Sequence, residues 1–189
     1  MTRFSFPVSG YLWLKAAVFT LLVLNTGIYL ASGTFGEGLD SIAWLILLAL
    51  FLLETSSEKL GRTPSALAAI RAVRLAALAA IGAAAAGFFY NEEWLDAANS
   101  VLWIAVVVLL EWEVRRPAAV AAHRASFTAA AAALYSGLSV VALAWLWRGD
   151  WFDAYDAVLW LTAFATIELN VLAAARRTGT EGRGGETVA

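Results

Sequence analysis

The sequence predicts an all-α membrane protein of six transmembrane helices, arranged as three tandem helical hairpins with an approximate threefold internal repeat. The first observation behind this prediction is composition. Of the 189 residues, 61% are hydrophobic and 15% are charged, and the mean hydropathy is +0.73. Soluble domains have roughly 45–50% apolar and about 25% charged residues. The chain therefore carries more apolar surface than a soluble domain of this length can bury, and lipid is the solvent that it requires.

The second observation is a pattern that occurs three times, around Trp44, Trp103 and Trp160. In each copy an aromatic residue stands nine positions before the tryptophan, a carboxylate seven positions before it, and Asp or Asn four positions before it. These residues are Phe35, Trp94 and Trp151, then Glu37, Asp96 and Asp153, then Asp40, Asn99 and Asp156. A pattern at a regular interval indicates a repeated structural unit. Each unit holds two apolar segments around one acidic loop.

Six apolar segments follow one another along the chain, at about 11–32, 41–53, 68–90, 97–110, 125–148 and 157–175. A transmembrane helix needs about 20 apolar residues, and the odd-numbered segments meet this length. The even-numbered segments are shorter: the uncharged stretch between Asp40 and Glu54 covers roughly 20 Å at 1.5 Å per residue, against a hydrocarbon core of about 30 Å. Either the acidic loops dip toward the membrane, or the glutamates lie inside the inner leaflet.

These segments predict a single transmembrane bundle over residues 1–177, with hairpins at about 11–56, 66–114 and 118–176. Residues 178–189 are polar and rich in glycine, and we expect this tail to be disordered. The third segment and the start of the fifth are rich in alanine, which lets helix backbones approach closely in lipid. We therefore expect the odd helices to pack tightly and the even helices, with their tryptophans, to face lipid in part.

The basic residues predict the orientation of the bundle. Twelve of the 13 lie near the N-terminus, in 54–74, in 111–124 or in the C-terminal tail, and Arg148 alone lies among the acidic loops. Lys and Arg accumulate on the cytoplasmic side of membrane proteins. We therefore expect both termini in the cytoplasm and the acidic loops outside, in a bacterial-type inner membrane.

The residue types that are scarce or missing limit the chemistry. The chain has no cysteine and a single histidine, His123, which excludes thiolate catalysis and zinc sites with several histidines. No Ser/His/Asp set can be assembled, so we predict that the protein is not an enzyme. The basic residues lie at helix ends without a contiguous basic face, which argues against nucleic acid as a partner.

The acidic loops raise two interpretations. Residues three apart lie on one face of a helix, so three such pairs around one axis could supply the six to eight oxygens that Ca²⁺ requires, or a Mg²⁺ site. Acidic residues at a helix N-terminus also cap free N–H groups and complement the helix dipole, and their position favours capping. The candidate metal ligands are Glu37, Asp40, Asp96, Asn99, Asp153 and Asp156. No other cofactor is predicted.

The repeated aromatic residues are typical of a membrane interface, where an amphipathic ring suits the headgroup region. Stacking on a bound quinone, carotenoid or lipid is the alternative interpretation, although nothing in their spacing singles out such a ligand. The predicted interface aromatics are Phe35, Trp44, Trp94, Trp103, Trp151 and Trp160.

Glutamates recur toward the cytoplasmic ends of the even segments. Counting from the acidic loops places Lys15 at the depth of Glu54, and Arg74 at the depth of Glu113. We expect these two pairs to be structural ion pairs within the first two hairpins.

Glu168 has no base at the same depth in its own hairpin, and Glu111 occupies the equivalent position in the second hairpin. Ionisable groups inside a membrane are costly, and they often mark proton or cation pathways. Glu168, Glu111 and Asn170 are therefore the candidate transport residues.

Two functions fit this sequence. The first is a channel or transporter for a cation or small solute, which the acidic outer surface attracts. The second is a non-catalytic, structural or accessory subunit of a larger membrane protein complex. Lipid is the expected partner in both cases, together with a homo-oligomer or a larger complex.

Overall fold

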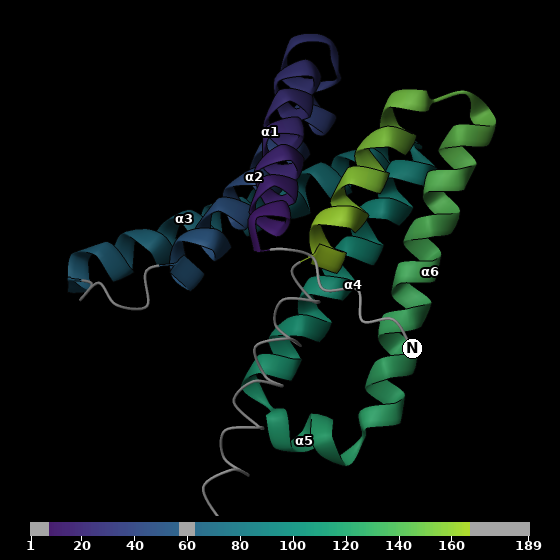
Figure 1. Cartoon of the computed structure of the whole chain (residues 1–189). Coiled ribbons are helices and arrows are strands. Elements are labelled where there is room, and N and C mark those ends of the chain that lie inside the picture. The colour runs from purple at the N-terminus through teal and green to yellow at the C-terminus, as the bar shows by residue number, and fades with distance from the viewer. Residues whose placement is uncertain (1–7, 57–62, 167–189) are drawn as a thin grey trace, which may run out of the picture.

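The computed structural model describes residues 8–56 and 63–166, and this part of the chain consists of helices without strands (Figure 1). A C-terminal helix at residues 151–166 follows six earlier helices. These are α1 (Val8–Ser32), α2 (Phe35–Ser56), α3 (Pro64–Tyr90), α4 (Trp94–Arg115), α5 (Pro117–Ala122) and α6 (Arg124–Arg148).

Five of these helices, namely α1, α2, α3, α4 and α6, are long and apolar enough to cross a membrane. The fold therefore agrees with the membrane protein that the composition predicts. The sixth predicted segment, 157–175, extends past the described residues, as does the tail 178–189. The count of six transmembrane helices stays a prediction.

The even helices begin earlier than their apolar segments. The first carboxylate of each repeat lies in the opening turn of a helix, and not in a loop. In α2 a capping box explains this start: the Thr34 amide donates to the Glu37 carboxylate, and the Glu37 amide donates to the Thr34 hydroxyl over 3.3 Å. Because α2 and α4 each have 22 residues, they reach about 33 Å at 1.5 Å per residue. The predicted shortfall in length disappears.

Short turns join the two helices of each hairpin. After α6, Gly149 adopts a left-handed conformation with φ of 89°, and the Asp150 amide donates back to the Trp145 carbonyl over 2.9 Å. Such a glycine turn is a common helix end. The next helix can therefore start at once and run back beside α6.

α5 is a helix that the sequence analysis did not predict. It begins at Pro117, where the missing N–H of proline leaves no helical hydrogen bond unmade. It links the second hairpin to the third.

The long helices pack in a closed ring. Within hairpins α1 packs on α2 and α3 on α4, and between hairpins α3 packs on α2 and α6 on α4. The C-terminal helix (yellow in Figure 1) lies between α6 and α1. It packs on α6 through Ala154 and Ala157, and it meets α1 where the rings of Phe152 and Tyr29 are 4.9 Å apart. Each hairpin thus contacts both of the others.

The three repeated tryptophans form the centre of this ring. Trp44, Trp103 and Trp160 are only 5–8% exposed, and their ring centroids are 6.2, 6.3 and 6.5 Å apart. These three side chains face the inside of the bundle and not lipid, and their predicted role at the membrane interface stays a prediction. Burial is tolerable because the indole N–H can find an acceptor inside the bundle: Trp44 Nε1 donates to Asp40 over 3.1 Å.

The other three repeated aromatics behave differently. Phe35, Trp94 and Trp151 are 62–86% exposed at the starts of their helices. This position suits the predicted interface role.

Candidate functional site

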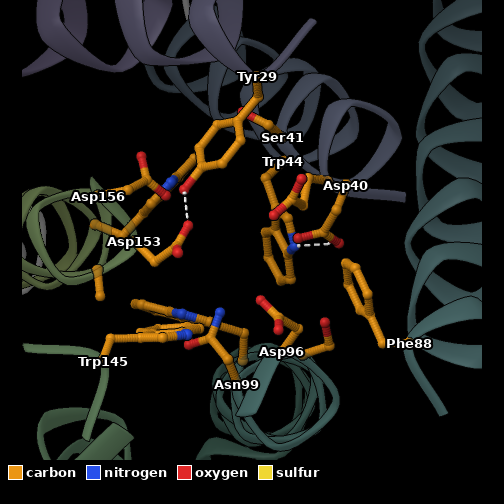
Figure 2. A pocket seen from close by; sticks show the side chains of 15 residues that line it. Tyr29, Asp40, Ser41, Trp44, Phe88, Asp96, Asn99, Trp145, Asp153 and Asp156 are labelled. Carbon is orange, nitrogen blue, oxygen red and sulfur yellow. Dashed lines mark hydrogen bonds between the residues drawn. The ribbon is translucent and has the colours of Figure 1, made fainter. Parts of the chain in front are cut away.

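A pocket lies above the three central tryptophans, at the end of the bundle where the hairpins turn (Figure 2). We call it the acidic pocket. Its volume is about 60 Å³, and every long helix contributes to its lining. The residues that line it are Tyr29, Glu37, Asp40, Ser41, Trp44, Phe88, Asp96, Asn99, Ser100, Trp103, Trp145, Asp153, Asp156, Ala157 and Trp160.

These 15 residues occupy the same five positions in each hairpin. The five are the central tryptophan and the residues 3, 4, 7 and 15 positions before it. The sequence analysis singled out the tryptophan and the positions 4 and 7 before it. It missed two positions whose residue type changes between copies: Ser41, Ser100 and Ala157 at position 3, and Tyr29, Phe88 and Trp145 at position 15. Because Tyr29, Phe88 and Trp145 are all aromatic, a search for repeated aromatic positions could have identified position 15 from the sequence.

The aromatic residue at position 15 reaches across to the preceding hairpin. A Cβ added to Gly36 of α2 would lie 3.1 Å from the Phe88 ring of α3, so the glycine makes room for that ring. Tyr29 of α1 packs in the same way on Phe152 of the C-terminal helix. These contacts place one aromatic ring in the pocket wall at each junction between hairpins.

The pocket is strongly acidic. Five carboxylates, from α2, α4 and the C-terminal helix, line it, and none of the described lining residues is basic. Carboxylates gathered in a partly buried space disfavour one another's charge. A bound cation or a proton relieves that repulsion.

Neutral donors hold some of these carboxylates in place. The Tyr29 hydroxyl donates to Asp153 over 2.8 Å, as Figure 2 shows, and the Asn25 amide donates to Asp156 over 2.9 Å. Trp160 also donates to Asp156, as Trp44 does to Asp40. Because these donors carry no charge, they orient the carboxylates without neutralising the pocket.

Asp153 lies in the first turn of the C-terminal helix, before the last predicted apolar segment. Burial raises the pKa of this carboxyl above its usual range, the hydrogen bond from Tyr29 opposes the shift, and the nearby charge of Glu37 adds to it. The acidic pocket therefore favours a proton or another cation over an empty, fully ionised state.

Among residues 8–56 and 63–166, two buried polar atoms of the pocket lining have no hydrogen-bond partner. They are Oδ1 of Asn99 and Oγ of Ser100, both on α4 and both buried. Ser100 is only 1% exposed. Its counterpart Ser41, by contrast, shares a hydrogen bond of 2.9 Å with Thr26. Buried polar groups are paired in the great majority of cases, so this pair of free oxygens distinguishes the α4 side of the pocket.

The predicted calcium or magnesium site stays a prediction. The six predicted ligands, Glu37, Asp40, Asp96, Asn99, Asp153 and Asp156, all line the pocket. Among residues 8–56 and 63–166, however, no three acidic or histidine side chains are grouped closely enough to hold a metal ion. The carboxylates lie on different sides of the pocket and several already accept a hydrogen bond, whereas Ca²⁺ requires six to eight converging oxygens.

Of the predicted transport residues, Glu111 is the one within the described part of the chain, and it does not line the acidic pocket. Glu111 is exposed and pairs with Arg115 of its own helix. The two residues are four positions apart, which is one helical turn. The prediction considered bases in the facing helix only. Glu168 and Asn170 lie outside the described residues. The side chain of Glu54 does so as well, and the pairs Lys15–Glu54 and Arg74–Glu113 stay predictions.

Comparison of the chain with protein families, with curated proteins and with solved structures gives no match. The acidic pocket is therefore the feature from which a function can be inferred.

Proposed function

We propose that the chain is a channel or transporter that takes up a cation in the acidic pocket. The observation that carries this proposal is the meeting of five carboxylates, drawn from all three hairpins, in one pocket whose described lining holds no base. Clustered negative charge between low-dielectric walls raises the local concentration of cations. A site of this kind at the end of an apolar bundle is suited to the first step of cation uptake.

The proposal includes a threefold repeat of tandem hairpins about an axis along the membrane normal. Hairpins repeated in the same orientation are related by such an axis. Two facts support it: the pocket lining uses the same five positions in each hairpin, and neighbouring hairpins pack in the same cyclic order. The axis would then pass through the pocket and the three central tryptophans.

The three tryptophans form the floor of the pocket. Their rings contact one another pairwise, and below them lies a core of buried apolar side chains that includes Leu22, Ile81 and Leu138. Passage of a cation through the bundle requires these rings to separate. The arrangement described here is therefore the closed state of the proposed pathway.

Flux into liposomes tests the proposal. The double variant Asp40→Asn, Asp156→Asn removes two charges from the lining and keeps the side-chain shapes. Purified protein is reconstituted, and uptake is followed with an internal pH or cation dye. We expect uptake to fall at least about tenfold, because a two-charge change in a partly buried site is worth more than about 1.4 kcal/mol.

Glu92→Gln is the matched control, since Glu92 lies at the same end of the bundle but does not line the pocket. Its uptake should equal that of the unmodified chain. Uptake by the double variant at the unmodified rate, with melting curves showing that it is folded, would refute the proposal.

A further inference from the structure

We infer that the acidic pocket binds a small primary alkylammonium ion, R–NH₃⁺, in preference to a metal ion or a quaternary ammonium ion. This inference rests on the proposed uptake of a cation and names the chemistry of that cation. Three features of the lining carry it: aromatic rings, free acceptor oxygens and limited space.

Six of the 15 lining residues are aromatic: Tyr29, Phe88, Trp145 and the three central tryptophans. Aromatic rings attract ammonium groups through their π faces and pack against alkyl groups. A hard metal ion gains little from rings, because it needs converging oxygens. The described residues hold no three acidic or histidine side chains grouped for a metal ion, so the rings favour an organic cation.

The α4 side of the pocket presents three acceptors on one helical face. Asn99 and Ser100 follow Asp96 by three and four positions, so each of them lies about one helical turn from Asp96. Figure 2 shows Asp96 and Asn99 projecting from α4 toward the middle of the pocket. Asn99 Oδ1 and Ser100 Oγ are buried and have no partner within the described residues.

A primary ammonium group has three N–H donors. It can satisfy the carboxylate of Asp96, the amide oxygen of Asn99 and the hydroxyl of Ser100 together. A quaternary ammonium ion has no N–H and would leave both free oxygens without a partner. The free oxygens therefore select an ammonium group that carries hydrogens.

The size of the pocket limits the alkyl group. A volume of about 60 Å³ corresponds to roughly four to six water-sized groups, at about 10–15 Å³ each. One ammonium group and about three to five carbons fit in this space. The carbons would rest on the tryptophan floor while the nitrogen meets the oxygens of α4.

Calorimetric titration of the full-length chain in detergent tests the inference. Methylammonium, tetramethylammonium and calcium, each as the chloride, are titrated at constant ionic strength. We expect methylammonium to bind at least about tenfold more tightly than either of the others. Ser100→Ala should weaken methylammonium binding by about three- to tenfold, the loss typical of one hydrogen bond.

Two further variants keep the test independent of folding. Asn99→Asp introduces the residue that the first and third hairpins carry at this position, namely Asp40 and Asp156, and should tighten methylammonium binding. Glu92→Gln, outside the pocket lining, should bind methylammonium as the unmodified chain does.

The outcomes separate this inference from the function on which it rests. Calcium or tetramethylammonium binding as tight as that of methylammonium would overturn the inference and leave cation uptake standing. Unchanged methylammonium affinity in the folded Ser100→Ala variant would also overturn it. If none of the three cations binds, the inference is wrong, and the liposome assay alone decides the proposed uptake.

Discussion

Ser41, Ser100 and Ala157 hold the same place in the three hairpins, three residues before the central tryptophan, yet they meet different surroundings. Ser41 shares a hydrogen bond with Thr26 of α1, whereas Ser100 is buried and finds no partner in the part of the chain that the structure describes. Ala157 has no polar group at all. The chain therefore tolerates a methyl group at this position and keeps a hydroxyl on α4 at a cost in stability.

Alanine at these two serines should change stability in opposite directions. In the unliganded protein, Ser100→Ala removes an unpaired buried hydroxyl, and we expect the free energy of unfolding to rise by about 1 kcal/mol. Ser41→Ala leaves the Thr26 hydroxyl with only its bond to the Leu22 carbonyl, and we expect a loss of about 1 kcal/mol. Thermal melting in detergent without added amine measures both changes. A fall in melting temperature for Ser100→Ala as large as that for Ser41→Ala would contradict this expectation.

At the scale of helices, the junctions between hairpins depend on a large ring that packs on the neighbouring helix. Phe88 of α3 lies against Gly36 of α2, and Trp145 of α6 belongs to a cluster on which Leu95 of α4 packs. The ring that packs across a junction also lines the acidic pocket. Packing between hairpins and the shape of the pocket are therefore set by the same side chains.

Substitution of glycine should distinguish this junction from an open helix surface. In Gly36→Val the Cβ alone would lie 3.1 Å from the Phe88 ring, and the added methyl groups would force α2 and α3 apart. We expect a loss of about 1–3 kcal/mol, the usual cost of overpacking. Gly82→Ala is the control, because a Cβ there meets nothing within 4 Å, and alanine should stabilise α3 by about 0.5–1 kcal/mol. Equal melting temperatures for the two variants would show that the junction is not tightly packed.

The sequence predicted the helices better than it predicted their faces. Apolar length located the five helices that are long enough to cross a membrane, and the repeated pattern indicated which polar residues recur. It could not show that the tryptophans point inward, because a ring with one N–H suits a membrane interface as well as a core with an acceptor, such as Asp40 beside Trp44. It also began the even segments at 41, 97 and 157, after the carboxylates, since charge ends an apolar stretch whether or not the helix continues.

At the scale of the whole molecule, the pocket exists only because the chain closes on itself. The hydrogen bonds Asn25–Asp156 and Tyr29–Asp153 join residues 131 and 124 positions apart. No local pattern predicts such contacts, whereas three copies of one unit make a ring a natural arrangement. The meeting of the acidic ends was foreseeable from the repeat. The partners of each carboxylate were not, because Asn25 and Tyr29 do not recur in the other hairpins.

The proposed uptake requires the acidic pocket to face the outside of the cell, and single cysteines can test that orientation. The chain has no cysteine of its own, so each introduced thiol is labelled without background from native cysteines.

Ser32 and Asn91 are exposed beside the acidic helix starts, and His123 is exposed between α5 and α6 at the other end of the bundle. Because the stretches of sequence predicted to lie on the side of His123 hold twelve of the 13 basic residues, the rule for Lys and Arg predicts that this side is cytoplasmic. In intact cells, Ser32→Cys and Asn91→Cys should react with a membrane-impermeant maleimide. His123→Cys should react only after the membrane is permeabilised. Labelling of His123→Cys alone in intact cells would turn the pocket toward the cytoplasm, and the direction of the proposed transport would be reversed.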